Sequence, residues 1–166
     1  MRISADILRS WPVVKQVTYE CFHRQYQHGS FWLGDPDCLL LHGAELTEEE
    51  KRFHLSCALA SCGAQIISDP MPELTEGERI WMQQLLDNRL ERCVFLDSDC
   101  TIARGVSCTG EEAYLFFNPT DEETRPSQTV PAGVYTELWS GEKLEISGDM
   151  TVTLAPHAAR VYLRQK

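Results

Sequence analysis

The chain has 166 residues, of which 43% are hydrophobic and 24% charged, and 25 acidic against 15 basic side chains give a formal net charge of −10. Four Trp, five Tyr and six Phe are too many for a disordered tail, and no apolar run reaches the roughly 18 residues that a membrane span requires. An acidic balance is the opposite of the basic patch that binds phosphate, so we expect no nucleic-acid and no membrane partner. The start of the chain lacks the apolar core of a signal peptide, and we expect a cytoplasmic location.

The cysteine content is high, but its pattern predicts neither a disulfide framework nor a metal centre. The count is odd and includes no C-x-x-C; the residues are Cys21, Cys38, Cys57, Cys62, Cys93, Cys100 and Cys108. The sequence also has no glycine-rich phosphate loop. We therefore expect reduced thiols, no bound metal and no cofactor.

Up to about residue 90 the pattern alternates short apolar strands with helices, which is typical of an α/β layer. A helix is predicted over residues 11–27, with Ser10 at its N-cap and Gly29 ending it. A short strand is expected at about 30–33, followed by a Gly-Asp-Pro-Asp loop that the proline makes rigid.

Two further helices are predicted to begin at capping boxes, in which a threonine is followed three residues later by a glutamate. The residues of these boxes are Thr47, Glu50, Thr75 and Glu78. Between the two helices, residues 65–68 are predicted to form a short buried strand that ends at Asp69.

After residue 90 the hydrophobic period changes to two, with turn residues between the apolar segments. Seven strands are predicted, at residues 92–96, 101–107, 113–117, 134–139, 144–146, 150–154 and 159–163. Short strands at this spacing favour a small antiparallel β-sandwich. The predicted fold class is therefore α/β followed by all-β, with one domain at 1–89 and a second at 90–166.

The first predicted domain contains three strand–helix units. A closed (β/α)8 barrel needs eight such units and about 250 residues. An open three-stranded sheet would leave strand edges unpaired. We therefore expect this domain to be incomplete.

Acidic side chains recur at one end of the predicted sheet, where α/β barrels place their catalytic groups. The candidates are Arg2 and Asp6 at the end of the first strand, Asp35 and Asp37 after Trp32, and Asp69 after the third strand. A surface ion pair is the alternative for the first two, and a loop-bracing role is the alternative for the others.

Three segments carry a family resemblance, and they read MRISADILRSW, FWLGDPDCLLL and LTEEEKRFHLSCALASCGAQIISDPMPELTEGE. Together they resemble the closing stretch of the catalytic barrel of α-galactosidases (melibiases), glycoside hydrolase families 27 and 36. Members of these families show an Arg-x-x-x-Asp on the sixth strand, a Trp-x-Asn-Asp-Pro-Asp-Cys-Leu-type segment on the seventh and a Ser-Asp strand end on the eighth. The later segments ELWSGEKLEI and APHAARVYLRQ resemble the β-sandwich that follows. The resemblance covers essentially all 166 residues and implies the last three units of a partial (β/α)8 TIM barrel plus a C-terminal sandwich.

Carried over by position, the resemblance implies that Asp6 is the general acid/base of a retaining glycosidase and that Arg2 binds a sugar hydroxyl. Trp32, Asp35 and Asp37 match a motif at the rim of the pocket, where the resemblance implies substrate-subsite and bracing roles. A retaining glycosidase also needs a second carboxylate about 5 Å away as nucleophile. The families carry it on the fourth strand, in a Lys-Trp/Phe-Asp type motif that this sequence lacks.

The resemblance therefore implies a fragment of a glycoside hydrolase that acts on terminal α-galactosides, with the fragment inactive alone. One departure from the pattern lies at Gly34, where the families usually have Asn. Two alternatives without enzymatic activity stay open. One is a non-catalytic folded module, and the other is a half-barrel that associates with a second copy through its open edges.

Overall fold

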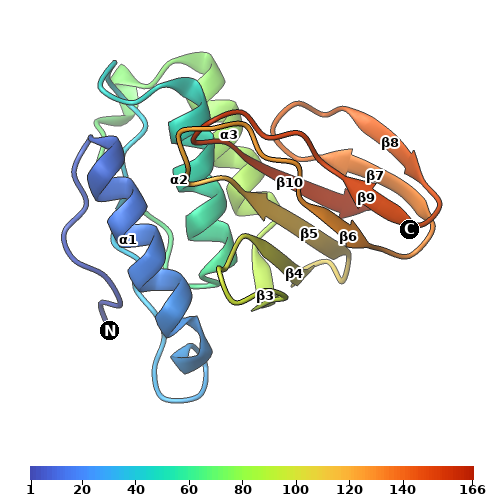
Figure 1. The fold of residues 1–166 in the computed structure, drawn as a ribbon. Helices are drawn as coiled ribbons and strands as arrows, with labels where there is room; N and C mark the ends of the chain where they lie inside the picture. Colours follow the sequence, from blue (N-terminus) through green and yellow to red (C-terminus); the bar gives the residue numbers. More distant parts are fainter.

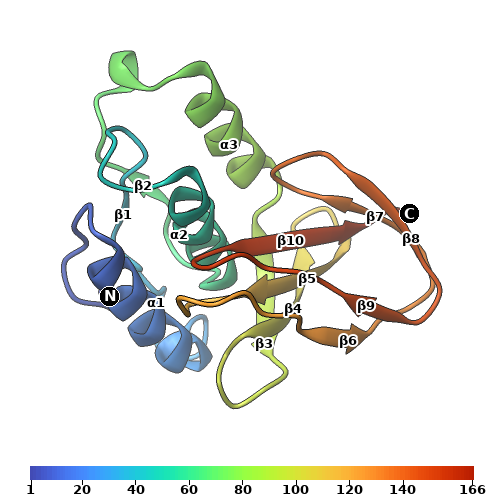
Figure 2. The same cartoon turned by 45° about the horizontal axis from the view of Figure 1, so that its top comes forward.

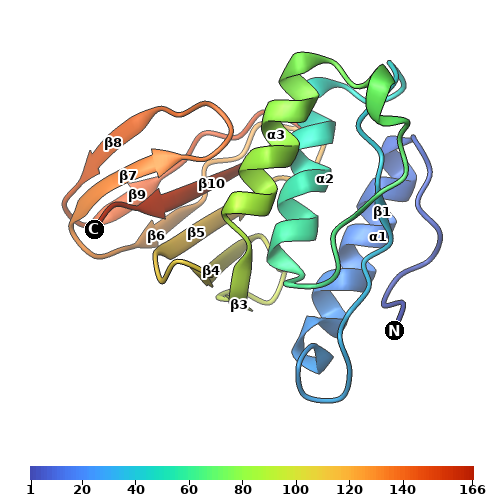
Figure 3. The ribbon, with the colours of Figure 1, turned by 180° about the vertical axis from the view of Figure 1, so that it is seen from behind.

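A computed structural model describes residues 1–166 and contains three α-helices beside a mainly antiparallel set of strands (Figure 1). The helices are α1 (Trp11–Arg24), α2 (Glu48–Ala60) and α3 (Glu76–Asp87). Seen from behind, α2 stands between α1 and α3, and the three form a layer on one side of the strands (Figure 3). None of these helices is both long and apolar enough to cross a membrane. The fold is mixed α/β.

The two predicted capping boxes are confirmed, and they set where α2 and α3 begin. The Glu50 N–H donates to Thr47 Oγ1 at 3.3 Å, and the Thr47 N–H donates to the Glu50 carboxylate at 2.8 Å. In the second box the Glu78 N–H donates to Thr75 Oγ1 at 3.2 Å, and the Thr75 N–H donates to the Glu78 carboxylate at 2.9 Å. Each box provides partners for backbone N–H groups that the first turn of a helix leaves unpaired.

The helix predicted over residues 11–27 is confirmed, but the strand predicted just after it is wrong. The helix α1 continues into a 3₁₀ turn, η1 (Gln25–Gln27), and Gly29 then takes a left-handed φ of 73°. The segment folds back on itself, because the Gly29 N–H donates to the Trp32 carbonyl at 2.9 Å. Residues 30–33 therefore form a tight loop instead of a strand.

The parallel layer is smaller than the sequence pattern predicted. Its two strands, β1 (Cys38–Leu39) and β2 (Ile66–Ile67), pair in parallel. The N-terminal segment, expected to be a strand, pairs with this layer in the manner of a strand only at one bridge, between Arg2 and Asp35. The strand predicted at 65–68 is confirmed in place, but its first isoleucine is half exposed rather than buried. Strand edges in this layer are left without neighbours.

The strands predicted after residue 90 are confirmed in place. Six form an antiparallel sheet in the order β3-β4-β5-β10-β7-β8, and β9 pairs with β6 in a second, two-stranded sheet. Their bounds are β3 (Leu90–Phe95), β4 (Ile102–Ser107), β5 (Glu112–Phe117), β6 (Ser127–Thr129), β7 (Gly133–Glu137), β8 (Lys143–Ile146), β9 (Asp149–Thr151) and β10 (Ala159–Arg164). Sequence reasoning missed β6 because its three residues are polar and show no hydrophobic period. A cluster of nine buried residues, drawn from β5, β7, β9, β10 and nearby loops, packs between the two sheets.

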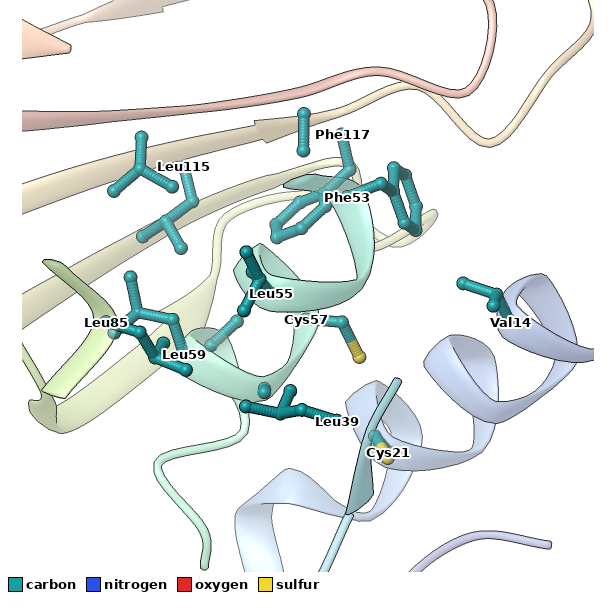
Figure 4. Packing of buried hydrophobic residues seen from close by; sticks show 14 of the residues in the cluster. Val14, Cys21, Leu39, Phe53, Leu55, Cys57, Leu59, Leu85, Leu115 and Phe117 are labelled. Carbon is teal, nitrogen blue, oxygen red and sulfur yellow. The ribbon is translucent and has the colours of Figure 1, made fainter. Parts of the chain in front are cut away.

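One hydrophobic core joins the helices to the larger sheet. Its 29 buried residues run from Ile3 near the N-terminus to Leu163 in β10, so both sides of the predicted boundary at residue 90 contribute. The helix α2 lies at its centre (Figure 4), where the Phe53 ring meets Phe117 of β5 edge to face at 5.5 Å between centroids.

Polar contacts also join α2 to the sheet region. The indole N–H of buried Trp139 donates to Ser56 Oγ at 2.9 Å. At the start of the same helix, Glu50 contacts His157 at 2.9 Å, and the imidazole stacks on Trp11 with centroids 4.1 Å apart. These contacts fix the helical layer against the strands and thereby position the segments that precede each helix.

Candidate functional site

Asp37 is the centre of a polar cluster that holds the N-terminal segment against the parallel layer. Its Oδ2 accepts hydrogen bonds from Arg2 Nη2 and from the Ile7 N–H, each at 2.7 Å. Asp37 takes a left-handed φ of 75°, and its own N–H donates to the Asp35 carboxylate at 3.0 Å. The Asp35 backbone in turn bonds to Met1 and Ile3. The short Asp-Pro-Asp segment therefore aligns the residues that carry the candidate chemistry.

Electrostatics favour the ionised form of Asp37. Burial by itself raises the pKa of this carboxyl, but backbone hydrogen bonds from Ile7 and Cys38, together with the Arg2 guanidinium, outweigh it and hold the pKa below its usual value. A carboxylate with several donors in a partly buried place acts as an anchor. Asp37 is thus committed to holding the segment in place.

Arg2 connects this anchor to Asp6. Its Nη2 also donates to Asp6 Oδ1 at 3.1 Å and to the Ala5 carbonyl at 2.9 Å. The Asp6 side chain is 93% exposed, so its pair with Arg2 is a surface contact that contributes little stability. Asp6 is therefore free to turn toward a ligand while Arg2 stays bound to Asp37.

Of the five residues to which the resemblance assigns a role, the structure brings together four and leaves Trp32 apart. Arg2, Asp6, Asp35 and Asp37 form the cluster just described, whereas no hydrogen bond or ring contact joins Trp32 to any of them. Its ring neighbour is Phe31, 5.9 Å away between centroids, and its indole Nε1 is buried without a hydrogen-bond partner. A role for Trp32 beside Asp6 has no contact to support it.

A second anchor was only half visible in the sequence. It lies at the other end of the parallel strands, because Asp37 precedes β1 whereas Asp69 follows β2, so the acidic residues expected at one end of the sheet are found at both ends. Asp69 is buried and accepts hydrogen bonds from the backbone N–H groups of Leu41 and His42 and from the Arg9 guanidinium. Burial raises the pKa of Asp69, and these donors outweigh it and lower the pKa overall. Sequence reasoning singled out Asp69 but missed Arg9, because a partner 60 residues away gives no local signal.

Glycine at position 34 has a steric explanation. The Gly34 N–H donates to the His28 imidazole at 3.0 Å, and a Cβ added at Gly34 would lie 3.2 Å from the same nitrogen. Gly63 approaches from the other side, since a Cβ there would lie 2.6 Å from the Gly34 carbonyl oxygen. Two chain segments therefore cross here at a separation that leaves little room for side chains.

Residues 1–166 contain no group of three or more His, Cys, Asp or Glu side chains arranged to hold a metal ion, and the seven cysteines are free thiols. The chemistry that the cluster can provide is that of its own groups. These are one exposed carboxylate, one guanidinium with several donors, and two carboxylates that orient them.

No family model matches the sequence, and no curated protein matches it. Solved structures do match, and they are glycoside hydrolases of the α-galactosidase type. The chain is similar over 99% of its length to a family 27 β-L-arabinopyranosidase from Geobacillus stearothermophilus, with 15% identity and a TM-score of 0.82. It is also similar over 98% of its length to α-galactosidase I from Mortierella vinacea, with 13% identity and a TM-score of 0.80. A third match is the α-galactosidase from Saccharomyces cerevisiae with raffinose, at 11% identity, 92% coverage and a TM-score of 0.66.

These matches show that the chain has the fold of part of these glycoside hydrolases. The chain spans 44% of the arabinopyranosidase chain, 52% of the Mortierella chain and 51% of the Saccharomyces chain, so it corresponds to about half of each. At identities of 11–15% the likeness concerns the fold. The expected resemblance to the α-galactosidase type is confirmed at that level.

Proposed function

We propose that these 166 residues form part of a retaining glycoside hydrolase that cleaves terminal α-galactosides or closely related pyranosides. In this proposal Asp6 is the general acid/base and Arg2 is a ligand for a sugar hydroxyl. Asp35 and Asp37 brace the segment that carries both. The similarity of the whole chain to half of several such enzymes supports the proposal, as does the arrangement of Arg2 between Asp6 and Asp37.

The chemistry assigns a distinct task to each group. A retaining glycosidase protonates the leaving oxygen with one carboxylic acid while a second carboxylate attacks the anomeric carbon about 5 Å away. The first group then removes a proton from the water that releases the sugar. The exposed Asp6 carboxyl suits the proton-transfer task, because it is free to meet a glycosidic oxygen. The N–H groups of Arg2 suit a sugar hydroxyl, since a guanidinium offers donors in a fixed geometry.

Asp37 does not suit the part of the nucleophile. Its reachable oxygen already accepts two hydrogen bonds at 2.7 Å, and an attack on carbon would break both. The proposal therefore places the nucleophile on polypeptide outside these 166 residues, and it places the rest of the barrel there too. The observation that carries the proposal is the exposed Asp6 linked through Arg2 to a fixed carboxylate at the edge of an open parallel layer.

The experiment is an assay of a polypeptide that contains this segment together with a nucleophile-bearing strand, using an aryl α-galactoside. We expect Asp6→Asn to lower kcat by about 10²- to 10⁴-fold, the range that general acid/base catalysis contributes. Glu45→Gln, on an exposed loop carboxylate, is the matched control and should leave the rate unchanged. An Asp6→Asn rate equal to that of the control would reject the assignment. The 166-residue chain alone should show no turnover.

The open edge of the parallel layer supports a second candidate function, self-association without catalysis. Met1, Leu33 and Ile66 belong to this region and are half to largely exposed, and unpaired strand edges favour pairing with another chain. Sedimentation of the 166-residue chain distinguishes the two. A dimer that dissociates when Ile66 is replaced by Lys would favour the half-barrel, and a monomer would dismiss it.

A further inference from the structure

A second site lies between the helical layer and the strands, away from the Arg2–Asp6 cluster. It is a cavity of about 490 Å³ that shares no lining residue with that cluster. Three segments form it: the second half of α1, the loop between β3 and β4, and the segment that follows β5. In Figure 2 the β3–β4 loop lies beside the C-terminal end of α1, and the segment after β5 comes near the same helix closer to its middle. Its volume is within the range of small-molecule pockets, about 300–1,000 Å³.

The cavity offers polar groups with unused hydrogen-bonding capacity. From α1 come the Tyr19 phenol, which makes no hydrogen bond, and His23, whose Nδ1–H donates to the Tyr19 carbonyl at 2.8 Å and leaves Nε2 as an acceptor. From the β3–β4 loop comes the exposed Asp99 carboxylate, with one long contact of 3.4 Å to Ser98. From the far side comes the Thr124 hydroxyl, which has no side-chain partner.

A narrow extension of the cavity ends at a buried polar atom. The extension shares Tyr19, Asp99 and Phe117 with the main cavity, and its volume of about 10 Å³ suits one water molecule or one hydroxyl group. Thr18 lines it, and the Thr18 side chain is almost fully buried with its Oγ1 lacking a hydrogen-bond partner. A buried hydroxyl without a partner costs about 1–3 kcal/mol, and a hydroxyl placed in the extension would provide one.

The lining selects a class of ligand. No Lys or Arg lines the main cavity, so an anionic group there would face the Asp99 carboxylate; the narrow extension is lined by Lys15. Only two of the eleven residues that line the main cavity are hydrophobic, but carbon atoms of the others make most of the lining surface apolar, so the cavity offers contacts for the C–H face of a ligand as well as for its hydroxyls. Hydroxyl, carboxylate and imidazole groups beside an aromatic ring match a ligand with many hydroxyls, because each can exchange hydrogen bonds with such a ligand.

We propose that the cavity between Tyr19, Asp99 and Thr124 binds one sugar residue, as a binding site separate from the Asp6 cluster. Asp99 and His23 accept hydrogen bonds from sugar hydroxyls, Thr124 and Tyr19 complete the rim, and an exocyclic hydroxyl reaches toward Thr18. This inference rests on the cavity alone and does not require the proposed function to hold.

The test is a titration of the 166-residue chain with D-galactose, followed by backbone amide chemical shifts. We expect saturable shifts at the cavity segments with a Kd on the order of 1 mM. Tyr19→Ala and Asp99→Asn should each weaken this binding by about tenfold, since each removes a group worth roughly 1.4 kcal/mol. Tyr26→Ala is the control, because Tyr26 is 68% exposed and lies outside the cavity. Dispersed amide spectra of each variant establish that it folds.

Three outcomes would overturn the proposal. The first is no shift at the cavity segments at saturating galactose, and the second is binding that neither Tyr19→Ala nor Asp99→Asn weakens. The third is a response to an alkylammonium ion but not to galactose, which would make Asp99 a cation site. Shifts confined to Arg2, Asp6 and Asp37 would be a case of the first outcome and would support the proposed function. Cavity shifts that persist in Asp6→Asn would support this site independently.

Discussion

At the scale of single residues, His54 shows how burial decides protonation. The His54 side chain is 3% exposed; its Nε2–H donates to the Cys38 carbonyl at 3.2 Å, and Nδ1 has no partner. Burial lowers the pKa of His54, more than the Cys38 contact and the carboxylates of Asp37 and Asp69 raise it. The imidazole therefore stays neutral in the folded protein at pH values where an exposed histidine is charged.

Because His54 stays neutral in the folded protein, the free energy of unfolding depends on pH. Below the usual pKa of about 6.5 the unfolded chain binds a proton at His54 that the folded chain does not, so the free energy of unfolding falls as the pH falls. The stabilisation linked to neutral His54 is fully present above about pH 6.5. Below that pH the free energy of unfolding falls by at most about 1.4 kcal/mol per pH unit, until the pH reaches the lowered pKa of His54 in the folded protein.

We expect His54→Gln, which keeps an N–H for Cys38, to remove this part of the slope. Urea unfolding at a series of pH values between about 7.5 and 5 measures it. His23→Gln, which changes an exposed histidine of α1, is the matched control for the loss of one histidine, and the test is the difference in slope between the two variants. Equal slopes in His54→Gln and wild type would show that burial of His54 does not set the dependence.

At the scale of elements, the caps are where local sequence and structure agree most closely. The first turns of α2 and α3 obey the threonine–glutamate pattern, and each glutamate also has a long-range partner. Glu50 contacts His157 at 2.9 Å, and Glu78 contacts Lys51 at 2.7 Å in a buried pair that joins α3 to α2. The caps therefore connect elements as well as start helices.

We expect Thr75→Ala to lower the free energy of unfolding by about 1 kcal/mol, because the Glu78 N–H loses its acceptor. Thr75→Ser keeps a hydroxyl at the same place and should stay close to wild type. Urea unfolding of the two variants side by side measures the difference. Similar losses in both would mean that the threonine methyl, and not the cap, carries the effect.

Elements set by local signals were predictable, and those set by distant contacts were not. The strands after residue 90 follow from alternation and turn residues, while β6 has no apolar residue to mark it. At the candidate site, the Arg2–Asp6 pair lies within one segment and was visible in the sequence. The partner of Asp69 was not visible, because Arg9 meets it only after the chain has folded back. The tight loop after Gly29 similarly replaced a strand that hydrophobicity alone favoured.

At the scale of the whole molecule, the shared core bears on the predicted division at residue 90. That division stays a prediction that residues 90–166 can fold alone, and the packing shows which buried surface would then be exposed. If residues 90–166 folded alone, the face of the larger sheet that α2 covers would be exposed, including the buried Leu115 and Val161. Burying such side chains contributes about 1.5–3 kcal/mol each.

We therefore expect limited proteolysis to degrade both parts of the chain together, without a stable product that begins near residue 90. Leu59→Ala, at a fully buried position on α2, should cost about 2–5 kcal/mol and should speed cleavage in the strands as well as the helices. Leu86→Ala, at a half-exposed position on α3, is the control. A long-lived fragment starting near residue 90 would instead favour the non-catalytic module.

The hydrogen bond between Trp139 and Ser56 also gives the molecule a built-in optical reporter. The Trp139 indole belongs to the segment after β7, is 6% exposed, and donates its N–H to a helix on the other side of the core. Indole fluorescence responds to the polarity around the ring, so separation of the helices from the sheet would shift the emission of this tryptophan toward that of a solvated indole. The change in emission when the helical layer separates thus includes a contribution from Trp139, beside those of the three other tryptophans.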